Sequence, residues 1–153
     1  MKLSTKGRYA MVALADIALQ PADQLVSLGE IAERQAISLP YLEQLFVKLR
    51  RADLVTSVRG PGGGYRLSRS PAEIRVVDIL AAVDETVDAM QKGAGASGGL
   101  SGSRAQSLTN RLWEGLSAHV YVFLHQTRLS DVIENELAPC PAVPNLMAVV
   151  DEG

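Results

Sequence analysis

The chain has 153 residues, of which 47% are apolar and 5% aromatic. This length suits one domain, or a small domain with an appendage, and this apolar fraction excludes a disordered chain. The net charge of -2 divides into +4 over residues 1–70 and -6 over residues 71–153. This asymmetry indicates a polyanionic partner for the first half. The alternative is that the charges only solvate the protein surface.

Three helices are expected in the first third of the chain. Residues Tyr9–Leu19 carry apolar side chains at helical spacing, with Ser4 or Thr5 as a candidate N-cap. Ser27 and Glu30 have the spacing of a capping box, in which each side chain bonds the other residue's amide, and a helix should follow through about Gln35. After a turn at residues 36–38, the third helix is expected at about Leu39–Ala52 because its apolar residues form one stripe: Leu39, Leu42, Leu45, Phe46 and Leu49.

A β-hairpin is expected next. The strand-like segments Leu54–Val58 and Tyr65–Leu67 are joined by Arg59 and a tip of glycine and proline, which is typical of a hairpin connection. A fourth helix is expected at about Val76–Val83.

The second half is expected to contain a long helix after a flexible loop. Of the eleven residues in 93–103, five are glycine and three are serine, and such a segment buries too little surface to offset its ordering entropy. A long apolar stripe then predicts a helix at about Leu108–His125. Ser130 is a candidate cap for a short helix through about Leu137, and three prolines exclude regular structure around Cys140.

The order of these elements predicts a mainly α fold with a small β-hairpin wing, the winged helix-turn-helix. In such folds the helix after the turn enters the major groove of DNA. Gln44 can bond adenine and Glu43 can accept from cytosine, while Lys48, Arg50 and Arg51 can neutralise phosphates and the Tyr41 hydroxyl can bond them. An ordinary solvated helix face would have a similar composition.

The hairpin is the more specific signal. Arg59 stands before the tip, and Gly60 and Gly62 can adopt positive φ and let the backbone approach DNA closely. An arginine at this place can enter a narrow minor groove. A nucleotide-binding loop is not supported, because the segment joins two strands and lacks the Gly-Lys-Ser/Thr ending of a P-loop.

A single cysteine, Cys140, rules out an intramolecular disulfide and suits a reducing compartment. The sequence starts without an apolar run long enough for a signal peptide, and it contains no stretch of about 20 apolar residues. We therefore expect a cytoplasmic protein with no membrane partner.

Three segments resemble signatures of the IscR-like iron–sulfur cluster regulators of the Rrf2 winged-helix repressor family. These are Ser4–Ala10, Ile37–Phe46 and Val58–Tyr65. The resemblance is dense over residues 1–89 and resumes at 108–113 and 129–133. One departure is Pro40, where close relatives have a small hydroxyl residue.

The resemblance implies a homodimer that binds a partly palindromic, double-stranded operator. It makes Tyr41, Glu43 and Gln44 the base readers, and it implies that the helix Leu108–His125 crosses its twin at the dimer interface. The full set of expected DNA contacts is Ser38, Tyr41, Glu43, Gln44, Lys48, Arg51, Ser57, Arg59, Gly60 and Gly62.

The composition and the resemblance together divide the chain into four expected parts. Residues 1–89 form the DNA-binding domain and residues 90–107 the flexible loop. Residues 108–137 form the dimerisation helix with the short helix after it, and residues 138–153 form a proline-containing tail.

The expected cofactor departs from the family pattern. Relatives hold an iron–sulfur cluster with three cysteines in the loop and a histidine at the start of the long helix, but residues 90–107 contain no cysteine and Asn110 replaces the histidine. The usual ligation is therefore excluded. Cys140 is a candidate ligand of a 2Fe–2S cluster, with non-cysteine ligands such as His119 or His125. Alternatively, the protein is cluster-free and answers to a protein partner or small molecule, or the loop cysteines were removed by engineering.

Together, these features and the resemblance predict a protein that represses, or also activates, genes for iron–sulfur cluster assembly or iron metabolism. A winged helix used only for protein interaction is the alternative of another class. No enzyme is expected, because no catalytic triad, paired carboxylates or metal-ligand spacing is found.

Overall fold

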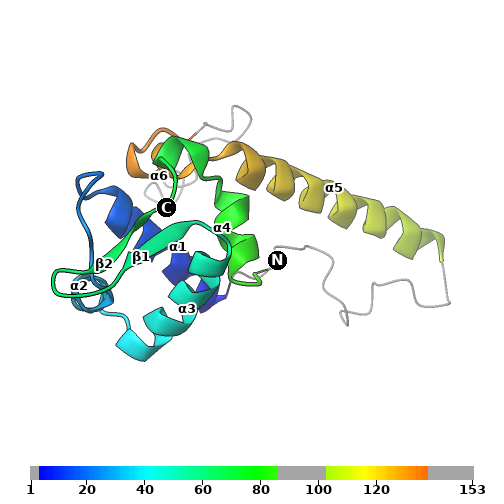
Figure 1. Cartoon of the computed structure of the whole chain (residues 1–153). Coiled ribbons are helices and arrows are strands. Elements are labelled where there is room, and N and C mark those ends of the chain that lie inside the picture. Colours follow the sequence, from blue (N-terminus) through cyan, green and yellow to red (C-terminus); the bar gives the residue numbers. More distant parts are fainter. Residues whose placement is uncertain (1–3, 86–102, 138–153) are drawn as a thin grey trace, which may run out of the picture.

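The computed structural model describes residues 4–85 and 103–137. The elements follow the order α1 (Thr5–Ala18), α2 (Leu28–Gln35), α3 (Leu39–Arg51), β1 (Val55–Val58), β2 (Gly64–Leu67), a 3-10 turn η1 (Pro71–Glu73), α4 (Val76–Ala82), α5 (Arg104–Gln126) and α6 (Leu129–Ile133). Figure 1 shows a compact body made of all elements except α5, which extends from it as an arm.

The helix-turn-helix forms where the sequence predicts it. The capping box of α2 is present, with the Glu30 amide bonding the Ser27 hydroxyl and the Ser27 amide bonding the Glu30 carboxylate. Ala36 ends α2 in the left-handed conformation, and the Ser38 hydroxyl then accepts from the Tyr41 amide to cap α3. These caps fix both ends of the turn between the two helices.

An ion pair between a buried carboxylate and a partly exposed guanidinium fixes α2 against α1. Asp16 of α1 is 4% exposed, and its two carboxylate oxygens accept from Arg34 Nη2 at 2.6 Å and Nε at 3.0 Å. Gln35 donates a further hydrogen bond at 2.8 Å. The Arg34 hydrogen bonds lower the pKa of Asp16 against the opposing effect of burial, so the carboxylate is charged at neutral pH.

The wing is a two-stranded antiparallel sheet, in which Val55 pairs with Leu67 and Val58 with Gly64. Val26 adds a bridge to Tyr65, with amide-to-carbonyl distances of 2.9 and 2.7 Å. The Tyr65 ring also packs edge-on against Phe46 of α3 at a centroid distance of 4.9 Å. The hairpin is thus held at a fixed position relative to α3.

One hydrophobic core unites the body. Leu14, Ile31, Leu42, Phe46 and Ile79 are fully buried in it. Leu129 of α6 is buried in the same core, although the sequence reading grouped this helix with α5 instead of with the DNA-binding domain. Backbone bonds from Val76 to Thr127 and from Leu129 to Ile74 return the chain to the body after α5.

Three helix boundaries differ from the sequence expectation, including the end of α6, which lies at Ile133 instead of near Leu137. The helix α5 begins at Arg104 instead of near Leu108, because the Ser103 hydroxyl accepts from the Gln106 amide and caps it. Ser130 lies inside α6 and does not cap it; the Asp131 carboxylate accepts from the Arg128 amide at this end.

Candidate nucleic-acid interface

The exposed face of α3 carries the residues expected to read DNA. Leu42, Leu45, Phe46 and Leu49 are buried, so the opposite face points outward. With 13 residues the helix is about 20 Å long, and its width fits a major groove of about 12 Å. Glu43, Gln44 and Arg51 are exposed there.

Two of the three candidate base readers have side chains that are available to an incoming partner. Within the described residues, Glu43 and Gln44 make no side-chain hydrogen bond to another residue. Tyr41 is half-buried, and its ring contacts Tyr9 of α1 edge-on at 5.6 Å. Tyr41 is therefore oriented by α1, while Glu43 and Gln44 are free to adopt the rotamers that base edges require.

The geometry of the wing tip depends on its glycines. Gly60 and Gly62 have φ values of +107° and +74°, which L side chains rarely adopt. The Gly63 amide donates to the Gly60 carbonyl at 2.9 Å, and a Cβ at Gly63 would lie 2.2 Å from the Val58 carbonyl oxygen. The tip is a tight turn that requires glycine at these three positions.

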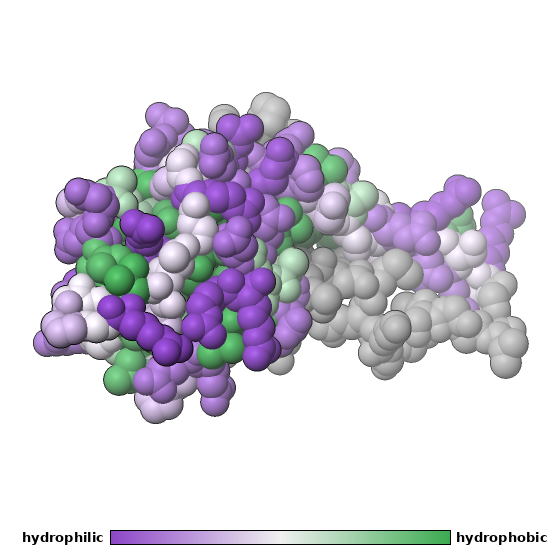
Figure 2. Space-filling view, in the orientation of Figure 1, coloured by the Kyte–Doolittle hydropathy of each residue, from purple (hydrophilic) through white to green (hydrophobic). Residues whose placement is uncertain are grey.

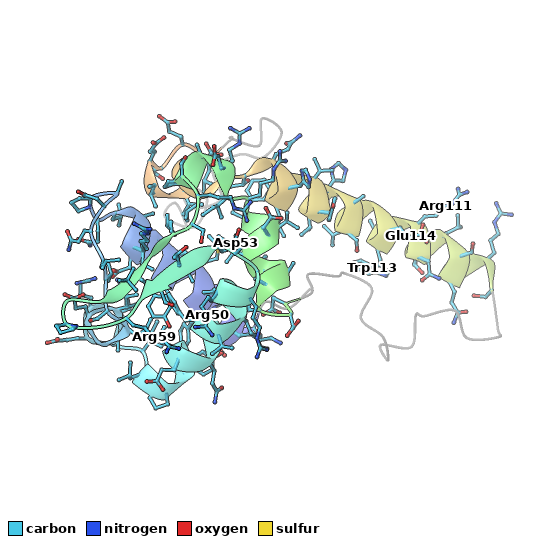
Figure 3. All side chains as sticks on the ribbon, in the orientation of Figure 1. Arg50, Asp53, Arg59, Arg111, Trp113 and Glu114 are labelled. Carbon is cyan, nitrogen blue, oxygen red and sulfur yellow. The ribbon has the colours of Figure 1, made fainter. Side chains whose placement is uncertain are left out.

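The tip presents Arg59 directly after β1. Arg59 is exposed, and Ser57 lies half-buried in the strand opposite Tyr65. Figure 3 shows Arg59 and Arg50 on the side of the body where the hairpin and α3 lie. Figure 2 shows hydrophilic side chains over much of this side of the body. A duplex lying along α3 could therefore meet a cation from the wing.

Lys48 differs from the other basic residues of α3. Its ammonium is 2.9 Å from the Asp84 carboxylate, and Lys6 of α1 donates to the Asp84 carbonyl at 3.3 Å. The Lys48 hydrogen bond lowers the pKa of Asp84, which keeps the carboxylate charged. The sequence reading assigned Lys48 to phosphate contact and did not foresee this acidic partner.

The start of α1 is a part of this face that the sequence reading missed. Lys6 and the exposed Arg8 lie in its first two turns, and the Tyr9–Tyr41 contact holds α1 beside the beginning of α3. The available signal was the pair of basic residues directly after the helix cap. Their charges extend the basic face from α3 to α1.

The described residues do not supply a ligand set for an iron–sulfur cluster. No group of three His, Cys, Asp or Glu that could hold a metal occurs in residues 4–85 and 103–137. His125 Nδ1 is 2.8 Å from Arg75 Nη1, and since guanidinium only donates, this nitrogen accepts and is not available to a metal. Asn110 has a buried amide oxygen without a hydrogen-bond partner, but an amide oxygen is a poor substitute for a thiolate. Cys140 lies outside the described residues.

The long helix leaves an apolar surface uncovered. None of the side chains of α5 is buried, and the exposed apolar ones include Leu108, Leu112, Trp113, Leu116 and Phe123. In Figure 3 Trp113 extends from α5 on the side away from Arg111. An exposed apolar surface of this kind is typical of an interaction site.

Comparisons with known proteins agree with this arrangement. Residues 3–135 match the Rrf2 family, described as iron-dependent transcriptional regulators. The chain is 75% identical over 154 residues to the HTH-type transcriptional regulator IscR of Cereibacter sphaeroides, with 99% of each chain covered.

The solved structures that are similar to this chain include two regulators with related sequences. The CymR global cysteine regulator of B. subtilis is 31% identical, with a TM-score of 0.75 over 88% of this chain and 98% of that chain. IscR of T. potens is 35% identical, with a TM-score of 0.69 over 97% and 96%. Among the described helices, none is long and apolar enough to cross a membrane.

Proposed function

Because the chain belongs to the Rrf2 family of iron-dependent transcriptional regulators, we propose that it binds operators as a homodimer and represses genes of iron–sulfur cluster assembly or iron metabolism. It is a DNA-binding transcription regulator with a winged-helix fold, and its relatives, named as transcription regulators, confirm that it is not an enzyme. The 75% identity to an IscR regulator supports the iron-related targets and a site of action in the cytoplasm.

The observation that carries the DNA-binding mechanism is the common face of α3 and the wing. Docking begins with phosphate contacts from the basic residues, which supply salt-dependent affinity without sequence preference. Glu43 and Gln44 then read base edges in the major groove, while Arg59 reaches the neighbouring minor groove. Ser38, Tyr41, Arg51, Ser57, Gly60 and Gly62 complete the proposed contact set.

A salt titration tests this function against a protein-interaction module with the same fold. We expect the affinity for a promoter duplex to fall steeply as the salt concentration rises, and competitor DNA of random sequence to bind more weakly than a selected operator. A protein that binds neither duplex at low salt would refute the proposal. A protein that binds both equally would refute the base-reading part alone.

The homodimer is supported by the uncovered apolar surface of α5. A two-fold axis would place this surface against its own copy, which buries it without another partner. A dimer also presents two copies of α3 to the two half-sites of a palindrome, about one helical turn apart. The proposed interface runs along residues Leu108–His125.

The effector chemistry has two candidates. The first is an iron–sulfur cluster at Cys140 with non-cysteine ligands, of which His119 is exposed and His125 accepts from Arg75 through Nδ1. The second is a cluster-free regulator, which the likeness to the CymR global cysteine regulator supports. A bound cluster would supply redox or iron sensitivity, but the described residues contain no cradle for it.

Anaerobic reconstitution separates the two candidates by a signal independent of DNA binding. The cluster proposal predicts visible absorption and bound iron that the Cys140→Ser substitution abolishes. A colourless, iron-free protein after reconstitution would eliminate it and leave the cluster-free regulator. Colour that survives the substitution would exclude Cys140 as a ligand.

A further inference from the structure

Two consecutive carboxylates after α4 contact both helices of the DNA-binding face. The Asp84 carboxylate is 2.9 Å from Lys48 of α3, and the Asp84 carbonyl accepts from Lys6 of α1. The Glu85 carboxylate accepts from the Ser4 hydroxyl and, at 3.2 Å, from the Gly7 amide at the start of α1. The two carboxylates therefore occupy positions next to lysines and a helix N-terminus. Without these carboxylates, such positions would attract a phosphate.

The backbone holds these carboxylates in place. Asp84 has a φ of +58°, its amide donates to the Ala81 carbonyl at 3.1 Å, and the Glu85 amide donates to the Leu80 carbonyl at 2.9 Å. These bonds terminate α4 with a left-handed residue, a position usually taken by glycine or asparagine. The buried neighbour Val83 further fixes the turn, so Asp84 is directed at Lys48 by the fold.

The hydrogen bonds of Glu85 make it an anchor for Asp84. Burial disfavours its charged form, but the bonds from Ser4 and Gly7 outweigh burial and lower its pKa. The charged carboxylate therefore ties the end of α4 to the start of α1. This tie leaves Asp84 little freedom to move away from Lys48.

The Lys48–Asp84 pair is open to a competing anion. The Lys48 side chain is 42% exposed and the Asp84 side chain 73% exposed, and ion pairs with such exposure are weak because water screens them. The DNA backbone carries one negative charge per about 1.7 Å of its axis. A phosphate that approaches Lys48 meets an ammonium already paired and, beside it, the repelling charge of Asp84.

We propose that Asp84 is an autoinhibitory residue, whose carboxylate occupies Lys48 and lowers the affinity of the α3 face for DNA. The inference rests on the proposed function, since it requires Lys48 to lie within reach of a bound duplex. In wild-type protein Lys48 contributes less than a full phosphate contact. Removal of the Asp84 charge releases Lys48 and strengthens binding.

The first test compares Asp84→Asn with the wild-type dimer on a mixed-sequence duplex of about three helical turns. Asparagine keeps the shape and tolerates the left-handed conformation. Because the dimer contains Lys48 twice, we expect the affinity to rise about 3- to 10-fold at low salt, and the slope of log affinity against log salt to steepen by up to about 1.8, the value of two phosphate contacts. Glu73→Gln is the matched control, because it removes one charge from an exposed residue of η1, and it should change neither quantity.

A double-mutant cycle distinguishes occupation of Lys48 from a general charge effect. Lys48→Ala alone should weaken binding, and Asp84→Asn should give a smaller gain in the Lys48→Ala background than in the wild type, because only the direct repulsion by Asp84 is then left to remove. A gain of equal size in both backgrounds would overturn the proposal in favour of non-specific repulsion. Unchanged or weaker binding by a normally folded Asp84→Asn protein would overturn it as well, as would normal binding by Lys48→Ala.

These failures are distinct from a failure of the proposed function. If the wild-type protein shows no salt-dependent binding, the DNA-binding proposal fails and the inference about Asp84 fails with it. If the wild-type protein binds and Arg59→Ala weakens it while Asp84→Asn has no effect, only the autoinhibitory role is refuted. A thermal melt of each variant identifies any loss of affinity caused by unfolding.

Discussion

Truncating Leu112 should weaken the proposed dimer by a calculable amount. Leu112 lies on α5 and is 61% exposed in the single chain. Full burial of a leucine side chain stabilises by about 2 kcal/mol, so covering the exposed part contributes about 1.2 kcal/mol. A two-fold interface contains the residue twice, and Leu112→Ala loses most of both contributions, or about 2 kcal/mol per dimer. The dissociation constant should rise roughly 30-fold.

Analytical ultracentrifugation over a range of protein concentrations measures this change. Leu19→Ala is the control, because Leu19 is 68% exposed at the end of α1 in the body, and its truncation should leave the dimer constant unchanged. Equal effects of the two substitutions would show that general surface hydrophobicity, not the α5 surface, drives association. A wild-type protein that stays monomeric at micromolar concentration would refute the α5 interface itself.

Three further predictions concern the wing, the base readers and the fold. Arg59→Ala should weaken operator binding by about 1–3 kcal/mol, with partial recovery in Arg59→Lys, as measured by fluorescence anisotropy; unchanged affinity at moderate salt would exclude the wing contact. Glu43→Ala should relax base preference in a randomised operator library while the salt slope stays constant, and an unchanged preference would reject its role. Asp16→Asn should lower the free energy of unfolding by about 2 kcal/mol at neutral pH. The folded-state pKa of Asp16 is lowered, so the carboxylate's contribution to stability is present above the ordinary pKa of about 3.9 and is lost as the pH falls through the folded value. In urea denaturation, the free energies of unfolding of the wild type and the variant should therefore converge in acid. A difference that stays constant with pH would contradict the ion-pair account.

Local sequence signals predicted the helix-turn-helix because its elements are fixed by neighbours in the chain. The Ser27–Glu30 capping box and the Ser38 cap act over three residues, and Pro40 restricts the start of α3. The conformation of the wing tip was also predictable from the sequence, and Gly60 and Gly62 do adopt positive φ. These features need no tertiary information.

The parts that were missed depend on contacts between distant residues. Ser4 was taken as a candidate helix cap, but its hydroxyl bonds Glu85 instead. Lys48 was assigned to phosphate, yet the fold brings Asp84 to it from 36 positions away. Leu129 joins the core of the body because backbone bonds at residues 74–76 draw the chain back after α5. The spacing of residues within a short stretch of sequence cannot predict contacts between residues so far apart in the chain.

Methylation interference on a selected operator tests the central claim most directly, because dimethyl sulfate modifies guanine N7 in the major groove and adenine N3 in the minor groove. The account predicts interference at the guanines of the base pairs that α3 reads in the major groove and, beside them in each half-site, at adenines contacted by Arg59 in the minor groove. In Arg59→Ala the minor-groove interference should disappear while the major-groove interference remains. Interference confined to one groove in the wild type, or minor-groove interference that survives the substitution, would contradict a single duplex held by both elements.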